Sequence, residues 1–135
     1  MVKITSNVID IEAVINGVRN ESSGGIIAYV GLIRNTSQHG KPVISVEYSD
    51  ADGNAEAKLQ SIADDIKDKW PINDIAFVHR IGKLKVGDNN LVVAVSAAHR
   101  QEGFDACKYA INQFKAKLPT SKKETYLDGT CYESE

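Results

Sequence analysis

The 135-residue sequence predicts a single α+β domain, in which helices pack over a mixed or antiparallel sheet. Three observations lead to this prediction. The runs 75–81 and 91–98 are apolar at nearly every position, as central strands covered on both faces are. The segments 54–70 and 101–117 carry apolar residues at helical spacing. Hairpin-length links between some of the strands favour a mixed or antiparallel sheet.

The first half of the chain is expected to hold a short helix, two strands and a polar loop. In chain order these are a helix over 11–19, a strand over 26–33, a loop over 35–42 and a strand over 43–49. Asp10 is suited to cap the helix, and Gly24 opens the first strand. The loop is rich in turn-forming residues, so we expect it to be mobile.

The second half is expected to hold two longer helices and four strands. In chain order these are a helix over 54–70, strands over 75–81 and 91–98, a helix over 101–117, and short strands over 123–127 and 130–134. Pro71 ends the first of these helices, and Gly87 and Asp88 make the turn between the two central strands. The buried stripe of the second helix is expected to contain Phe104, Cys107, Ile111, Phe114 and Leu118.

Composition and spacing argue against several classes of protein. No apolar run approaches the roughly 20 residues that a membrane helix needs, and the N-terminal segment lacks the apolar core of a secretory signal, so we expect a cytoplasmic protein with no membrane partner. A net charge of −2 without an aromatic–basic surface pattern argues against a nucleic-acid module. The three histidines and two cysteines lack ligand spacing, so we expect no metal and no cofactor.

One segment is nevertheless strongly cationic. Between Ala106 and Lys123 the chain has five lysines and no acidic residue, which indicates an anionic ligand. Just before this segment, His99 and Arg100 stand where a strand gives way to a helix, and a helix N-terminus attracts anions. The alternative, a backbone-satisfied histidine beside a surface arginine, is about as well supported.

Three further cationic positions are candidates for binding or catalysis. Lys115 lies about 60° from the centre of the apolar stripe, so it is expected to be partly desolvated and suited to proton transfer. Lys122 and Lys123 follow the helix-ending Pro119, and Arg34 closes the first long strand. A snorkelling lysine and ordinary surface charges remain the alternatives for these positions.

Several sequence blocks resemble the family of the large, catalytic subunit of molybdopterin synthase. They read GGIIAYVGLIRN, VEYSDADGNAEAKL, KWPINDIAFVHRIGKLKVGD, VAVSAAHRQEGFDACKYAINQFKAKLP and KKE. The resemblance implies an α/β hammerhead-type fold and a homodimer that binds two small ubiquitin-like sulfur-carrier subunits, forming a heterotetramer. It also implies a sulfurtransferase that uses the carrier's C-terminal Gly-Gly thiocarboxylate to convert cyclic pyranopterin monophosphate into the dithiolene of molybdopterin.

The resemblance implies roles for particular residues. Lys115 and Lys122 match the family's catalytic lysines, which also bind substrate. The other positions that match the substrate pocket are Arg34, His99, Arg100, Lys123 and Glu124. Of these, His99 and Arg100 are expected to serve the pocket of the partner protomer.

The sequence departs from the family at three places. Thr120 and Ser121 replace an apolar–aromatic pair, Ala51 replaces a common aromatic residue, and Tyr132 is the nearest substitute for a missing tryptophan. No charged candidate is lost. A non-catalytic pterin- or phosphate-binding protein with the same fold is therefore the rival interpretation.

Overall fold

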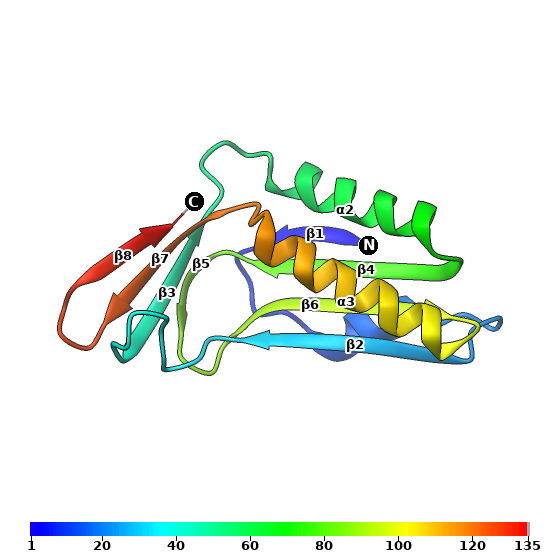
Figure 1. Ribbon diagram of the computed structural model, residues 1–135, viewed down its shortest axis with the longest axis horizontal. Coiled ribbons are helices and arrows are strands. Elements are labelled where there is room, and N and C mark those ends of the chain that lie inside the picture. The colour runs from blue at the N-terminus through cyan, green and yellow to red at the C-terminus, as the bar shows by residue number, and fades with distance from the viewer. Residues whose placement is uncertain (135) are drawn as a thin grey trace.

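The computed structural model describes residues 1–134 and contains three helices and two four-stranded sheets within them (Figure 1). In chain order the elements are β1 (Val2–Thr5), α1 (Ile11–Gly17), β2 (Gly25–Leu32), β3 (Val43–Ser49), α2 (Ala55–Lys69), β4 (Ile72–Arg80), β5 (Gly82–Lys85), β6 (Asn89–Ala97), α3 (Arg100–Ala116), β7 (Ser121–Tyr126) and β8 (Cys131–Ser134). None of the helices in 1–134 is long and apolar enough to cross a membrane.

The first sheet has the strand order β1-β4-β6-β2 and is mixed. β1 pairs with β4 in parallel, whereas the other pairs are antiparallel. One face packs against α2 and α3 around Phe77, and the other packs against α1 around Val78. The prediction of an α+β fold whose central strands are buried on both faces is therefore confirmed.

The second sheet has the order β5-β3-β7-β8 and is antiparallel throughout. It lies at one end of the first sheet, on the left in Figure 1, where α3 also ends. Its buried side contributes a separate apolar cluster that includes Val46, Leu84 and Tyr126. Leu118, just after α3, packs against this cluster and against the main core, so it connects the two.

Two strands were not predicted, and each is only four residues long. The sequence signal for β1 is the alternation of Val2 and Ile4 with polar residues. The strand is also held by the amino group of Met1, which donates a hydrogen bond to the carbonyl of Ile75 at 3.0 Å. β5 lies in the segment that we expected to be only a link between the central strands. Its one apolar residue between lysines, Leu84, is fully buried.

The expected buried stripe of α3 is wrong at Phe104, which is 54% exposed. The buried residues of this helix are instead Gly103, Ala106, Cys107, Ala110 and Phe114. Small residues in three of these positions let the helix lie close to the sheet. The face of α3 that packs against the sheet is therefore rotated away from the face that its large apolar residues, such as Phe104, predict.

Gly24 is expected to tolerate a side chain much less well than its neighbour Gly25. A Cβ on Gly24 would overlap the carbonyl oxygen of Ala98, whereas a Cβ on Gly25 would have no atom within 4 Å. Because backbone must move, Gly24→Ala should lower the free energy of unfolding by about 1–3 kcal/mol, and Gly25→Ala by less than about 1 kcal/mol. Urea denaturation measures both changes, and equal losses would contradict the prediction.

Candidate functional site

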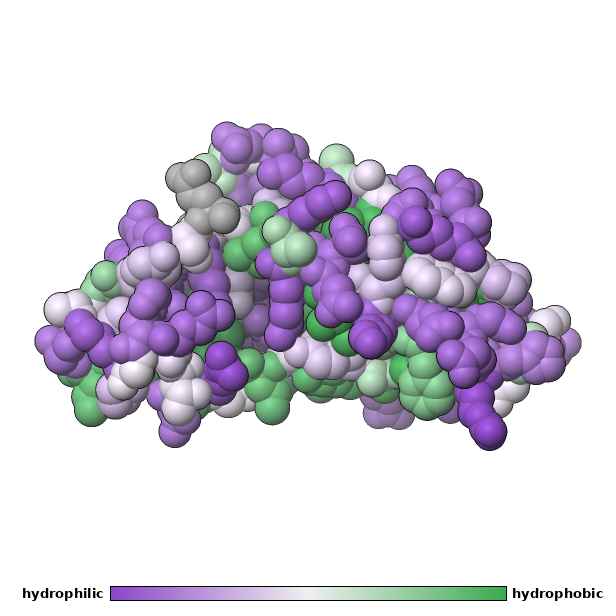
Figure 2. Space-filling model, in the orientation of Figure 1, coloured by the Kyte–Doolittle hydropathy of each residue, from purple (hydrophilic) through white to green (hydrophobic). Residues whose placement is uncertain are grey.

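Four of the seven candidate residues lie where α3 meets the second sheet. Lys115 is in the last turn of α3, Lys122 and Glu124 are on β7, and Arg34 is two residues beyond the end of β2. The C-terminal ends of β2 and α3 both point toward the second sheet (Figure 1), and the surface is hollowed between α3 and that sheet (Figure 2). The chain therefore brings these four side chains to one end of the molecule. We call them the lysine site.

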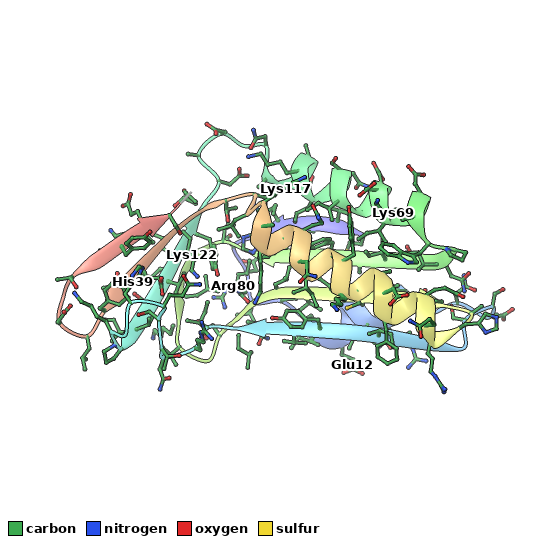
Figure 3. All side chains as sticks on the ribbon, viewed as in Figure 1. Glu12, His39, Lys69, Arg80, Lys117 and Lys122 are labelled. Carbon is green, nitrogen blue, oxygen red and sulfur yellow. The ribbon has the colours of Figure 1, made fainter. Side chains whose placement is uncertain are left out.

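β7 divides its charged residues between the two faces of the second sheet. Lys122 is opposite the buried Tyr48, and Lys123 is opposite the exposed Glu47. Cross-strand partners share a face and successive residues alternate, so Lys122 and Glu124 lie on the inner side and Lys123 on the outer side. Figure 3 shows Lys122 on the side that faces the first sheet. Lys123 therefore does not join the lysine site, contrary to the expectation that it shares the pocket.

His99 and Arg100 lie at the other end of α3. His99 is the N-cap residue, Arg100 is the first helical residue, and both side chains are exposed. At 1.5 Å per residue, Arg100 is about 22 Å along the helix from Lys115. One copy of the chain therefore does not bring this pair to the lysine site.

Within the described residues, 1–134, the candidate cations have no charged partner. Within 1–134 the two ion pairs join Lys41 to Asp128 and Arg80 to Asp88, so all the candidate cations are left free. Lys115 is exposed, which corrects the expectation that it is partly desolvated. In the same part of the chain, no three His, Cys, Asp or Glu side chains gather in a way that could hold a metal ion.

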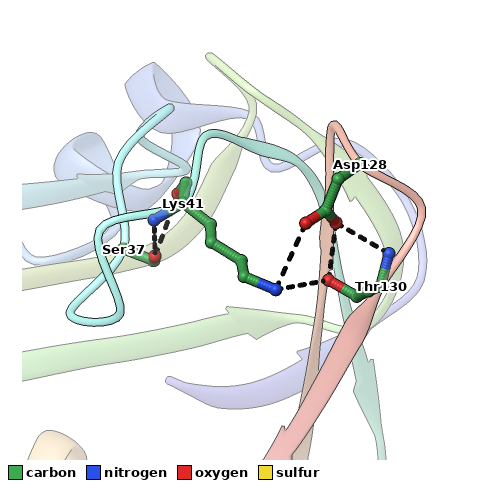
Figure 4. Close-up of polar contacts among 4 residues, drawn as sticks. All are labelled: Ser37, Lys41, Asp128 and Thr130. Atoms are coloured by element: carbon green, nitrogen blue, oxygen red, sulfur yellow. Dashed lines mark hydrogen bonds and ion pairs between the residues drawn. The ribbon is translucent and has the colours of Figure 1, made fainter.

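The polar loop that follows Arg34 is tied to the turn between β7 and β8. The Nζ atom of Lys41 lies 3.2 Å from Oδ2 of Asp128 and donates to Oγ1 of Thr130 at 2.9 Å (Figure 4). Within the loop, the hydroxyl of Ser37 donates to the carbonyl of Lys41 at 2.9 Å. The side-chain and backbone hydrogen bonds from Thr130, with Lys41, lower the pKa of Asp128 to about 2. These contacts hold the loop beside the second sheet.

A buried polar network lies behind Lys122 and connects the two sheets. Nδ1 of the fully buried His79 is 2.8 Å from the carbonyl oxygen of Asn90. Because a carbonyl only accepts, Nδ1 carries the hydrogen, and Nε2 accepts a hydrogen bond from the hydroxyl of Thr120 at 3.0 Å. The amide Nδ2 of Asn90 donates to the hydroxyl of Tyr48 at 2.8 Å.

The network gives a reason for two features of the sequence. A Cβ on Gly31 would lie 2.5 Å from Oδ1 of Asn90, so glycine at this position is what makes room for the asparagine. Thr120, which departs from the family pattern, is buried and uses its hydroxyl to satisfy His79. Sequence reasoning did not select His79, although a histidine inside an apolar strand is a signal that could have identified it.

Burial controls the protonation of the network. Burial lowers the pKa of His79 to about 4, against the smaller raising effect of its hydrogen bond to the Asn90 carbonyl. Burial also raises the pKa of Tyr48, against the lowering effect of the hydrogen bond from Asn90. Both rings are therefore neutral near pH 7.

We expect the buried His79 to make the protein lose stability as the pH falls from about 6.5 to about 4. The imidazole takes up a proton near pH 6.5 in the unfolded chain but only near pH 4 in the folded one. The unfolded state therefore binds more protons in this window, and acidification lowers the free energy of unfolding by up to about 3 kcal/mol. The contribution is fully present above the window and is lost below it.

Urea denaturation across this pH range measures the loss of stability. A His79→Gln variant lacks the titrating group, so its stability should depend less on pH in this window. A wild-type profile as flat as that of the variant would show that His79 does not control acid stability.

Comparisons with known proteins agree with this architecture. Residues 4–117 match the family model described as MoaE protein. A human protein named molybdopterin synthase catalytic subunit is 36% identical over 132 residues, which cover 98% of this chain and 70% of that protein. A Nostoc protein of the same name is 39% identical over 112 residues, which cover 82% of this chain and 67% of that protein.

Solved structures show the same relationship. The crystal structure of molybdopterin synthase from Staphylococcus aureus has a TM-score of 0.89 at 32% identity, covering 99% of this chain and 96% of that one. A chain from the complex of subunits 1 and 2 of the Helicobacter pylori molybdopterin-converting factor has a TM-score of 0.74 at 14% identity, covering 98% and 89%, which shows a shared fold. With the family model matched over most of its length, this chain belongs to the MoaE family, the catalytic subunits of molybdopterin synthase.

Proposed function

We propose that this chain is the catalytic subunit of a molybdopterin synthase. It transfers sulfur from the C-terminal thiocarboxylate of a small ubiquitin-like carrier to cyclic pyranopterin monophosphate. The observation that carries the proposal is the lysine site, in which Arg34, Lys115 and Lys122 lie at one end of the molecule and form no ion pair within residues 1–134. Both reactants are anionic, so the site matches them in charge.

We assign the sulfur-transfer chemistry to the two lysines. The thiocarboxylate sulfur forms a bond to a carbon of the precursor while a carbon–oxygen bond of that carbon breaks, and the oxygen leaves as water or as an oxygen of the opened phosphate ester. Water then attacks the carrier's carbonyl carbon, which breaks its bond to sulfur, releases the sulfur to the product and leaves a carboxylate on the carrier. Negative charge develops on the carbonyl oxygen during that attack, where a nearby ammonium group stabilises it. Lys115, exposed at the end of α3, has this role. Lys122 orients the reacting groups, and Arg34 binds the phosphate through its planar guanidinium.

A second copy of the chain completes the pocket in this proposal. β2 is an edge strand, and between it and α3 runs a groove of about 280 Å³ bordered by the exposed Phe104. A two-fold axis that passes through this surface perpendicular to α3 places the two α3 helices antiparallel. Arg100 and His99 of one copy then approach Lys115 of the other. The carriers bind at the two outer ends, which gives a heterotetramer.

Two details of the proposal follow from the geometry of a single chain. Glu124 shares the inner face of β7 with Lys122 and stays in the proposed pocket, whereas Lys123 faces outward and does not contact substrate directly.

The compartment that we propose is the cytoplasm, which agrees with Cys107 and Cys131 both being free thiols.

Removing either lysine should abolish most of the activity. We expect Lys115→Ala and Lys122→Ala to lower the single-turnover rate of sulfur transfer by at least about 100-fold, because each removes a cation from the reacting groups. The control is Lys67→Ala, an exposed lysine near the end of α2. The assay combines purified protein, thiocarboxylated carrier and precursor. Wild-type protein that binds the precursor but forms no product would instead support the non-catalytic rival.

The shared pocket predicts complementation between two inactive variants. In a mixed dimer of Lys115→Ala and Arg100→Ala protomers, one pocket receives both intact residues and the other receives neither. Random mixing should therefore restore roughly a quarter of the wild-type activity, because about half of the dimers are mixed and each has one intact site. Co-expression with two different affinity tags isolates the mixed dimer. If it has no more activity than the two parent variants, the pocket is not shared.

A further inference from the structure

His79 contacts the supports of both proposed catalytic lysines. Its ring lies 4.9 Å from the ring of Phe114 at an angle of 79°, and Phe114 directly precedes Lys115. On its other side, it lies 4.8 Å from the ring of Tyr48 at 82°, and Tyr48 faces Lys122 across the β3–β7 pair. One buried side chain therefore lies between two lysines that belong to different elements.

The ring of His79 is held at both nitrogens. Nδ1 donates to the carbonyl of Asn90, and Nε2 accepts from Thr120, which is two residues before Lys122. These bonds fix the orientation in which the ring meets Phe114 and Tyr48 edge to face, a geometry that aromatic pairs prefer. Because protein interiors are close-packed, a change in this ring shifts its neighbours rather than leaving them in place.

We propose that His79 is a positioning residue that sets the spacing between Lys115 and Lys122. It acts through Phe114 on the helix and through Tyr48 on the second sheet. The imidazole is 0% exposed and does not touch substrate. The proposal rests on the assignment of the two lysines made above. It adds a physical means of fixing the spacing between two lysines, one of which ends a helix while the other lies on a strand.

The spacing matters because both lysines act on one small reacting group. A displacement of about 1 Å in a catalytic group is enough to slow a reaction by about 100-fold. The position of Lys122 is constrained further because the hydroxyl of its cross-strand neighbour Tyr48 accepts a hydrogen bond from Asn90. No polar contact of the Lys115 side chain is found within residues 1–134, and the neighbour that links Lys115 to His79 is Phe114.

The test follows the lysines directly by NMR, with ¹³C at Cε of every lysine and the signals assigned by Lys→Arg variants. At a temperature well below unfolding, His79→Ala should shift the signals of both Lys115 and Lys122 but not that of Lys67. The same variant should transfer sulfur about 100-fold more slowly in a single turnover. A histidine that only stabilises the fold would change neither the two signals nor the rate at that temperature.

A pair of tyrosine variants tests one side of the arrangement alone. Tyr48→Phe removes the hydroxyl that Asn90 holds, so it should shift the signal of Lys122 and leave that of Lys115 in place. The matched control is Tyr126→Phe. Tyr126 is a buried tyrosine of the same sheet, and its hydroxyl, which lies near Ser37, takes no part in the network of His79 and Asn90. This control should shift neither signal.

Each outcome decides the proposal. Unchanged lysine signals with a rate within about twofold of wild type in His79→Ala would overturn it. If that variant does not fold, the tyrosine pair decides, and an unshifted Lys122 signal in Tyr48→Phe overturns the proposal. If wild-type protein transfers no sulfur, the assigned function fails, while the NMR experiment still shows whether His79 sets the spacing of the two lysines.

Discussion

The edge-to-face contact of His79 with Tyr48 and Phe114 is the constraint on which the arrangement of this protein depends. The first sheet, the second sheet and the end of α3 all meet at this imidazole. A phenyl ring would fill the same space but would leave the carbonyl of Asn90 and the hydroxyl of Thr120 without their partner. Buried polar groups are costly when unpaired, so the histidine both fills the junction and satisfies it.

Much of the fold could be predicted because its strongest elements carry local signals. β4 and β6 are apolar at successive positions since both of their faces are buried. β1 and β5 could not be predicted in this way because each has only four residues and is stabilised by residues far along the chain. The amino group of Met1, for example, donates a hydrogen bond to the carbonyl of Ile75. Phe104 was misplaced for a related reason. Hydrophobicity indicates which residues prefer burial, but only packing shows which face of α3 approaches the sheet.

The candidate site was predictable in its chemistry and much less in its geometry. The types and order of the residues are visible in the sequence blocks, and the resemblance assigns them a reaction. Which of Lys122 and Lys123 faces inward depends on the register of β7 against β3, which a local pattern does not contain. The separation of Arg100 from Lys115 follows from the length of α3, so the helix prediction already implied it.

The two parts of the proposed pocket are held by different physical interactions. Lys115 and Lys122 belong to one chain, and buried packing around His79 fixes how they lie relative to each other. Arg100 is proposed to reach them across a contact between two copies. In this proposal, disturbing that contact removes Arg100 from the pocket without moving the lysines, whereas disturbing the buried ring moves the lysines without weakening the contact between copies. In the proposed dimer, substrate binding and sulfur transfer are thus separable, although both are assigned to one pocket.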